Sequence, residues 1–208
     1  LSPIMKSDGA GGAFIVYEND PGLLRQKYVQ RLDRYGYVKF PGDGILVSAA
    51  DKHQTPGAVV ISDGSNGIII RYDDFYSQED PYLQYSFPYV QRIDSSGTKL
   101  WGEMGIQVSA DTLSTVRAMC SDGSGGVFLL YRKSYLLLQH VSSSGELLFG
   151  KEGIKLNDKD YHGNKPVMKY DGHGGFLFTM LNYNENTKEY NESVHYLNKD
   201  GQEKWHFQ

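Results

Sequence analysis

Residues 73–88 hold the side chains with the clearest potential to bind a ligand. The segment begins with two acids and continues with aromatic residues, and its candidate ligand-binding residues are Asp73, Asp74, Phe75, Tyr76, Tyr82 and Tyr85. Aromatic side chains with polar edges could form a lip that holds a sugar or a peptide. Carboxylates also ligate Ca²⁺, but Asp73, Asp74, Glu79 and Asp80 lack the regular spacing of an EF-hand loop. Alternatively, the segment is a surface loop whose aromatic side chains pack on one another.

Two histidines form a second group of candidates. His53 and His162 occupy matching positions in two connections between repeats, and acids such as Asp51 and Asp160 lie nearby. Imidazole beside a carboxylate can bind a metal or transfer a proton. No His-x-x-x-His motif or carboxylate pair accompanies them. We therefore expect no metal and no cofactor, and solvated loop histidines are the alternative to a ligand site.

Four further acids belong to a repeated turn. An Asp-Gly pair followed by another Gly recurs every 49 to 59 residues, at 8–12, 63–67, 122–126 and 171–175. Aspartate accepts hydrogen bonds from the backbone amides that follow it, and glycine supplies the positive φ angle of a tight turn. The sequence therefore predicts four structural hairpin turns rather than four acidic metal sites.

Each turn is preceded and followed by strand-like segments, and no segment has helical periodicity. The first strands are predicted at 3–7, 58–62, 117–121 and 166–170, and the second at 13–17, 68–72, 127–131 and 176–180. The third are predicted at 28–33, 89–94, 137–142 and 193–198, where His140 and His195 should lie at the edge of the core. A Gly and then an aromatic residue follow each third strand, and fourth strands begin at Ile45, Ile106 and Ile154.

Four antiparallel strands in a repeat of about 50 residues are typical of a β-propeller blade. We predict an all-β fold, a β-propeller built from four four-stranded antiparallel blades, as one domain over residues 1–208. The repeats cover approximately 1–54, 55–115, 116–164 and 165–208, the last incomplete. Either the four blades close into a ring, or they form an arc of a larger propeller, which we favour because an unfinished edge strand promotes aggregation.

The segment Asp94-Ser95-Ser96-Gly97-Thr98-Lys99-Leu100-Trp101 resembles the blade motif of PQQ-like propellers. The leading Asp-Gly-x-Gly-Gly turn is similar to that of bacterial exported propeller-repeat proteins of uncharacterised function. The third and fourth repeats carry Ser142 and Asn198 in place of the first Asp of this motif. The first and third repeats carry Phe40 and Phe149 in place of its Trp. The resemblance implies a secreted, periplasmic or cell-surface protein and transfers no cofactor ligand or catalytic residue.

Composition excludes several function classes. The formal net charge of −4 offers no basic stripe for nucleic acid, and the longest apolar runs are too short to span a membrane. The single Cys120 rules out an internal disulfide, and no nucleophile-elbow, Walker A or His-Glu-x-x-His motif occurs.

The repeats differ mainly in the length of the segment between their second and third strands, where a rigid scaffold usually carries binding loops. We therefore expect a non-enzymatic binding or scaffold module of the bacterial envelope or surface that engages a protein or a glycan through these loops. A hydrolase or lyase with an active site on the central propeller face is the alternative, and a structural spacer is a third possibility.

Overall fold

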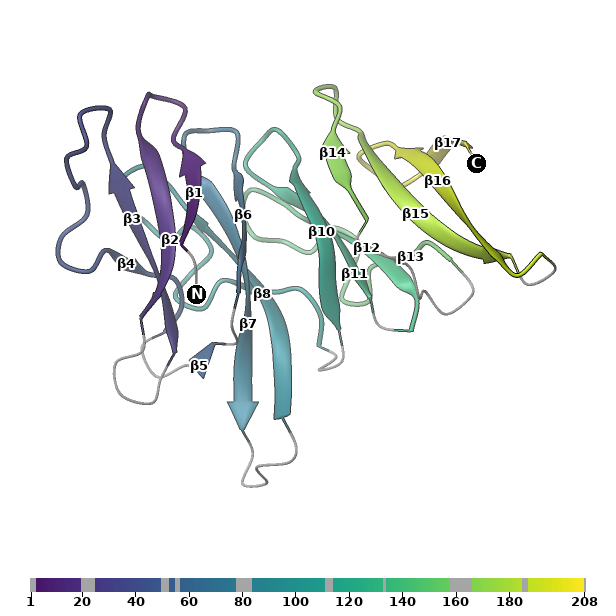
Figure 1. Cartoon of the computed structure of the whole chain (residues 1–208), viewed down its shortest axis with the longest axis horizontal. Coiled ribbons are helices and arrows are strands. Elements are labelled where there is room, and N and C mark those ends of the chain that lie inside the picture. The colour runs from purple at the N-terminus through teal and green to yellow at the C-terminus, as the bar shows by residue number, and fades with distance from the viewer. Residues whose placement is uncertain are drawn as a thin grey trace. The chain divides into compact units, whose positions relative to one another are not determined.

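The computed structural model describes residues 3–19, 25–49, 53–54, 57–77, 84–110, 114–132, 134–157, 166–184 and 187–207. Within these ranges the chain forms β-strands joined by turns (Figure 1). No helix in the described parts is long and apolar enough to cross a membrane. The chain divides into two compact units, Leu1–Leu113 and Ser114–Gln208, and each contains two sheets.

The first unit contains the first two sheets. The first sheet runs in chain order through β1 (Ile4–Ser7), β2 (Ala13–Asn19), β3 (Gln26–Leu32) and β4 (Ile45–Leu46). The second runs through β6 (Val59–Ser62), β7 (Ile68–Ser77), β8 (Gln84–Ile93) and β9 (Ile106–Gln107), and short β5 (His53–Gln54) also pairs with β7. Every pairing is antiparallel.

The second unit repeats this order twice. Its first sheet consists of β10 (Thr115–Ser121), β11 (Val127–Arg132), β12 (Leu136–Val141) and β13 (Ile154–Lys155). The other consists of β14 (Met168–Tyr170), β15 (Phe176–Asn184), β16 (Glu189–Leu197) and β17 (Glu203–Phe207). Four antiparallel sheets with strands in chain order confirm the predicted all-β fold of four propeller blades. The choice between a ring and an arc stays a prediction, as does the single domain.

The expected long loop at residues 73–88 is largely strand. β7 extends to Ser77 and β8 starts at Gln84, so the second and third strands of this blade form one long hairpin. Both acids at the start of the segment lie in β7: Arg71 donates to Asp73, and only 7% of Asp74 is exposed. The acidic residues therefore extend the strand instead of ending it.

A glutamine and an aromatic residue close each of the first three blades. In the third, the Gln139 amide donates to the Gly150 carbonyl oxygen at 2.6 Å and its Oε1 accepts from the Phe149 amide at 3.2 Å. Gln91 makes the equivalent bonds to Gly102 and Trp101 in the second blade, and Gln30 makes both of its bonds to the backbone of Phe40 in the first. These bonds satisfy buried polar groups and fix the chain that leads to the fourth strand.

The aromatic residue of one blade packs on a glycine of the next blade in its unit, in the turn that follows that blade's third strand. Phe40 is 4% exposed, and a Cβ atom at Gly97 would lie 3.0 Å from its ring. In the second unit Phe149 lies against Gly201 in the same way, at 3.2 Å. Two apolar clusters, one in each unit, continue this packing between the sheets.

The fourth blade ends differently from the other three. Its last strand, β17, begins at Glu203, only two residues after the turn glycine Gly201. In each of the other blades, the residue two positions after the turn glycine makes a single bridge to the third strand. The chain then leaves the sheet and returns for a two-residue strand. The fourth sheet therefore has its fourth strand, although the repeat pattern predicts that the chain stops just as that strand begins.

Candidate binding site in the second unit

The four repeated acids are turn residues, as predicted. In every Asp-Gly turn one carboxylate oxygen accepts hydrogen bonds from the amides two and four residues later, at 2.7 to 3.0 Å. The turn glycines that follow have positive φ angles, for example +76° at Gly123. This geometry explains the recurrence of Asp and Gly without a bound metal.

The second carboxylate oxygen has a partner that the repeat pattern alone did not predict. It accepts a hydrogen bond from a side chain of the third strand in every blade, and the pairs are Asp8–Arg31, Asp63–Arg92, Asp122–His140 and Asp171–Tyr196. The partner changes from arginine in the first unit to histidine and tyrosine in the second. The space next to the turn therefore differs between the units.

In the first unit, two side chains occupy the space between the Asp-Gly turns of the two blades. The Arg31 guanidinium donates to Asp8 and also reaches the second blade, where it donates to the Ser95 carbonyl oxygen at 2.8 Å. Asn66 of the second blade lies so close to the first that a Cβ atom at Gly9 would be 2.9 Å from its Oδ1 atom. The two blades are bridged at this point.

In the second unit, both positions carry smaller side chains. His140 stands where the repeat has Arg31, and Gly174 stands where it has Asn66. A hollow of about 440 Å³ lies here, lined by Asp122, Gly123, Ser124, Phe128, His140, Tyr170, Gly172, His173, Gly174 and Lys199. Its volume lies within the range of small-molecule binding sites. We take this hollow as the candidate binding site.

His140 is a buried polar residue that lines the hollow. It is 8% exposed, its ring stacks on Phe128 with centroids 4.0 Å apart, and its Nε2 atom lies 2.9 Å from Asp122 Oδ2. Its Nδ1 atom is buried and has no hydrogen-bond partner among the described residues. A buried polar atom without a partner is uncommon in proteins and marks a place where a ligand or water could bind.

The neighbouring carboxyl is held in its charged form. Burial alone would raise the pKa of Asp122, but hydrogen bonds from His140 and from the amides of Ser124 and Gly126 lower it to about 2. Burial and the charges of Asp122 and Asp171 raise the pKa of Cys120 to about 12. Near neutral pH the site thus has a fixed anion, and Cys120 is a neutral, unreactive thiol.

Tyr170 forms another wall of the hollow. A Cβ atom at Gly123 would lie 2.6 Å from the Tyr170 ring, so the ring packs directly on the turn backbone. The corresponding residue of the second blade is Ser62. His173 and Lys199 are exposed at the same site. The walls therefore combine an aromatic ring with several hydrogen-bond donors.

The Asp122–His140 pair should make the second unit sensitive to acid. Because the folded pKa of Asp122 lies below its unfolded value of about 3.8, its stabilisation is complete above that value and is lost as the pH falls towards 2. Asp122→Asn should lower the free energy of unfolding by about 2 kcal/mol at neutral pH, with a smaller difference below pH 3. Urea unfolding at several pH values measures this, with exposed Asp200→Asn as the control. An Asp122→Asn deficit that does not change with pH would contradict it.

The residues that the sequence predicts to bind a ligand, as far as the structure describes them, lie in the first unit and do not line this hollow. Asp73 and Asp74 are partly and fully buried on β7, and the backbone of His53 pairs with that of Phe75. The backbones of Tyr76 and Tyr85 pair with each other in the long hairpin. The structure thus brings His53 close to the acids and aromatic residues of this hairpin. Tyr82 and His162 lie outside the described residues.

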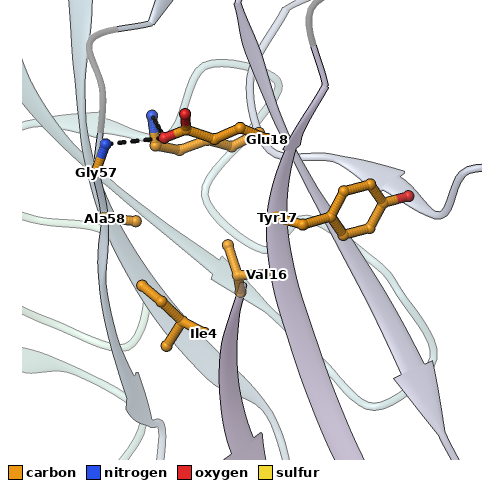
Figure 2. A pocket seen from close by; sticks show the side chains of 7 residues that line it. Ile4, Val16, Tyr17, Glu18, Gly57 and Ala58 are labelled. Atoms are coloured by element: carbon orange, nitrogen blue, oxygen red, sulfur yellow. Dashed lines mark hydrogen bonds and ion pairs between the residues drawn. The ribbon is translucent and has the colours of Figure 1, made fainter. Parts of the chain in front are cut away.

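A smaller pocket in the first unit contains a buried ion pair (Figure 2). Lys27 is fully buried, and its Nζ atom lies 3.4 Å from Glu18 Oε1, which also accepts a hydrogen bond from the Gly57 amide at 2.8 Å. Burial lowers the pKa of Lys27, while Glu18 and Asp73 favour its charged form. At about 100 Å³ the pocket is too small for a typical ligand. We therefore interpret the Lys27–Glu18 ion pair as structural.

No family model matches the chain, and neither does any curated protein. Similar solved structures include a glycosyl hydrolase from Bacteroides ovatus, with 10% identity and a TM-score of 0.40 over 98% of this chain and 69% of that one. Another is described as belonging to the GH130 family of mannoside phosphorylases, which contains glycoside hydrolases that target β-1,2 mannosidic linkages in Candida mannan. It has 9% identity and a TM-score of 0.39, and the match covers 98% of this chain and 68% of that one.

Proposed function

We propose that the chain is a non-enzymatic binding module that holds part of a glycan in the hollow of the second unit. The observation that carries this proposal is the loss of both bridging side chains, Arg31 and Asn66 in the first unit, at the equivalent positions of the second. The two units otherwise share strand order and turn chemistry. The hollow is therefore a local departure from the repeat, of the kind that function introduces on a constant scaffold.

The chemistry of the walls favours a ligand rich in hydroxyl groups. Lys199 and Ser124 can donate hydrogen bonds, and the backbone amides of the glycine-rich turns lie nearby. The ring of Tyr170 offers an apolar surface beside its hydroxyl group. A sugar presents the same combination of hydroxyl groups and apolar C–H surfaces.

Binding without hydrolysis is supported by the carboxyl groups. Glycoside hydrolysis generally uses two carboxyl groups, one of which donates a proton. Among the described residues that line the hollow, Asp122 carries the only carboxyl, and its pKa of about 2 makes it a poor proton donor. The envelope or surface location implied by the propeller-repeat resemblance belongs to the same proposal.

The test restores the first unit's residues in the second. His140→Arg with Gly174→Asn should refill the hollow, and Arg already pairs with the turn Asp in the first two blades. We expect the full chain to bind members of an array of neutral and acidic oligosaccharides, and the double variant to bind them at least about tenfold more weakly, a loss of about 1.4 kcal/mol. Thermal unfolding monitors the fold of the variant.

A second variant separates this site from the long β7–β8 hairpin. Replacing residues 76–85 with Asn-Gly shortens the hairpin and should leave binding unchanged. Loss of binding in the shortened variant, with normal binding in the double variant, would place the ligand on the hairpin instead. Release of reducing sugar from bound oligosaccharides would favour the hydrolase alternative, and a chain that binds nothing on the array would favour the spacer.

A further inference from the structure

The fourth blade replaces the structural glutamine of the other blades with His195. In the first three blades this column holds Gln30, Gln91 and Gln139, which bond to the chain after the second turn. In the fourth blade that chain is β17, which pairs directly with β16. The glutamine's bonding role is therefore absent at His195, and a different group of side chains occupies its place.

A β-bulge brings two residues of β17 to the same side as His195. Residues three apart normally point to opposite faces of a strand. Here Tyr196 pairs with Trp205 and Leu197 with Glu203, so Lys204 is an extra residue in β17. The extra residue places Glu203 and His206 on one face, and His206 lies directly opposite His195.

The three side chains converge on one point. Glu203 Oε1 lies 3.1 Å from His195 Nδ1 and 2.7 Å from His206 Nδ1. The potential ligand atoms of all three residues lie within 4.8 Å of one another. The two imidazole rings are stacked, with centroids 5.3 Å apart. Two imidazole nitrogens and a carboxylate oxygen are a donor set suited to Zn²⁺ and similar transition metals.

His195 is held in place by a buried hydrogen-bond chain. Its Nε2 atom lies 2.7 Å from Ser193 Oγ, which donates its own proton to the Met180 carbonyl oxygen at 3.2 Å, and its ring stacks on Phe178. In this arrangement Nε2 carries the proton, and the lone pair of a neutral His195 faces the Glu203 carboxylate. A lone pair directed at a carboxylate is stabilised by a cation between them. Such outer hydrogen bonds commonly orient metal-binding histidines.

We propose that His195, Glu203 and His206 bind a divalent transition-metal ion, with Zn²⁺ as the best-suited candidate. Three protein ligands leave a fourth tetrahedral position for water or an external ligand. Glu203 and His206 are exposed, so an ion can reach the site from solvent. The ion would join β16 to the last strand of the blade at the position where the other blades use glutamine.

The experiment uses the full chain, freed of metal by chelation and then titrated with Zn²⁺ in a calorimeter. The absorption spectrum of bound Co²⁺ reports tetrahedral coordination. Glu203→Gln and His206→Gln should each weaken Zn²⁺ binding at least about tenfold and reduce the tetrahedral Co²⁺ band. His173→Gln changes an exposed turn histidine and should leave both unchanged. Zn²⁺ affinity that is equal in all these variants, or no binding by the unmodified chain, would overturn the proposal.

Ser193→Ala tests how His195 is oriented. Loss of a hydrogen bond that orients a metal ligand typically weakens metal binding about 10- to 100-fold. The Zn²⁺ affinity should fall accordingly, and the metal-free variant serves as a check on folding through its thermal midpoint. An unchanged affinity would remove Ser193 from the proposed site, whereas the ligand variants test the site itself.

Discussion

Glu18→Gln should destabilise the first unit by about 3–5 kcal/mol, because it removes the negative charge opposite a buried lysine. Lys27 is fully buried, and its Nζ atom lies 3.4 Å from Glu18. Gln retains an oxygen for the Gly57 amide, so the variant changes the charge and leaves that hydrogen bond possible. The remaining ammonium would be buried with less compensation.

Lys27→Met distinguishes this explanation from a simple loss of packing. Methionine fills similar space without a charge, and replacing both members of a buried ion pair with uncharged side chains removes the cost of burying the two charges. We expect Lys27→Met to cost less than Glu18→Gln, because Glu18 keeps the hydrogen bond from the Gly57 amide and lies 3.8 Å from Arg25. Lys27→Met with Glu18→Gln should recover most of the stability lost in Glu18→Gln alone.

The measurement is urea unfolding of the full chain, with hydrogen exchange of β2 and β3 to assign the transition to the first unit. Glu103→Gln is the matched control, since Glu103 pairs with Lys99 at the surface and should contribute less than about 1 kcal/mol. Equal effects of Glu18→Gln and Glu103→Gln would contradict the assignment of Lys27 as a buried charge.

Phe40→Ala should cost about 3–5 kcal/mol, whereas Trp205→Ala, at the same repeat position, should cost about 1 kcal/mol. The Phe40 ring is 4% exposed and lies against Gly97 of the next blade, and Phe14 is its neighbour at 6.4 Å between centroids. Trp205 is 39% exposed and stacks on Tyr196 of its own sheet. The same sequence motif thus has different energetic consequences.

Thermal and urea unfolding of the two variants give the comparison directly. A cavity between two blades forms in Phe40→Ala, because the surrounding sheets cannot fully collapse into it. Losses of the same size in both variants would show that the aromatic column acts within each blade and does not depend on packing against a following blade.

The repeat, its turns and most of its strands could be predicted because their causes are local. An Asp-Gly turn requires its acid and its glycine within five residues, and the structure confirms this bonding at all four turns. The prediction was wrong about residues 73–77 and 84–88, which extend β7 and β8. Asp73 and Asp74 looked like loop residues because they are charged, and the hydrogen bond from Arg71 to Asp73 was not evident from the sequence pattern.

The hollow and the histidine cluster depend on contacts between distant residues. The change from Arg31 to His140 is visible when the repeats are aligned. Its consequence depends on the hydrogen bond from Arg31 to Ser95, which joins two blades and is not visible in the sequence. Glu203 and His206 share a face with His195 only because of the bulge at Lys204. Sequence alternation alone would place Glu203 and His206 on opposite faces.

The order of the strands also bears on how the chain folds during synthesis. In the parts of the chain that the structure describes, each strand apart from β5 pairs with strands that are its neighbours in the sequence. A sheet of this kind is complete once its own residues, about 50 of them, have been made, and it needs no strand from a distant part of the chain. Each blade can therefore form its backbone hydrogen bonds as it leaves the ribosome, with the blades following one another from the N-terminus.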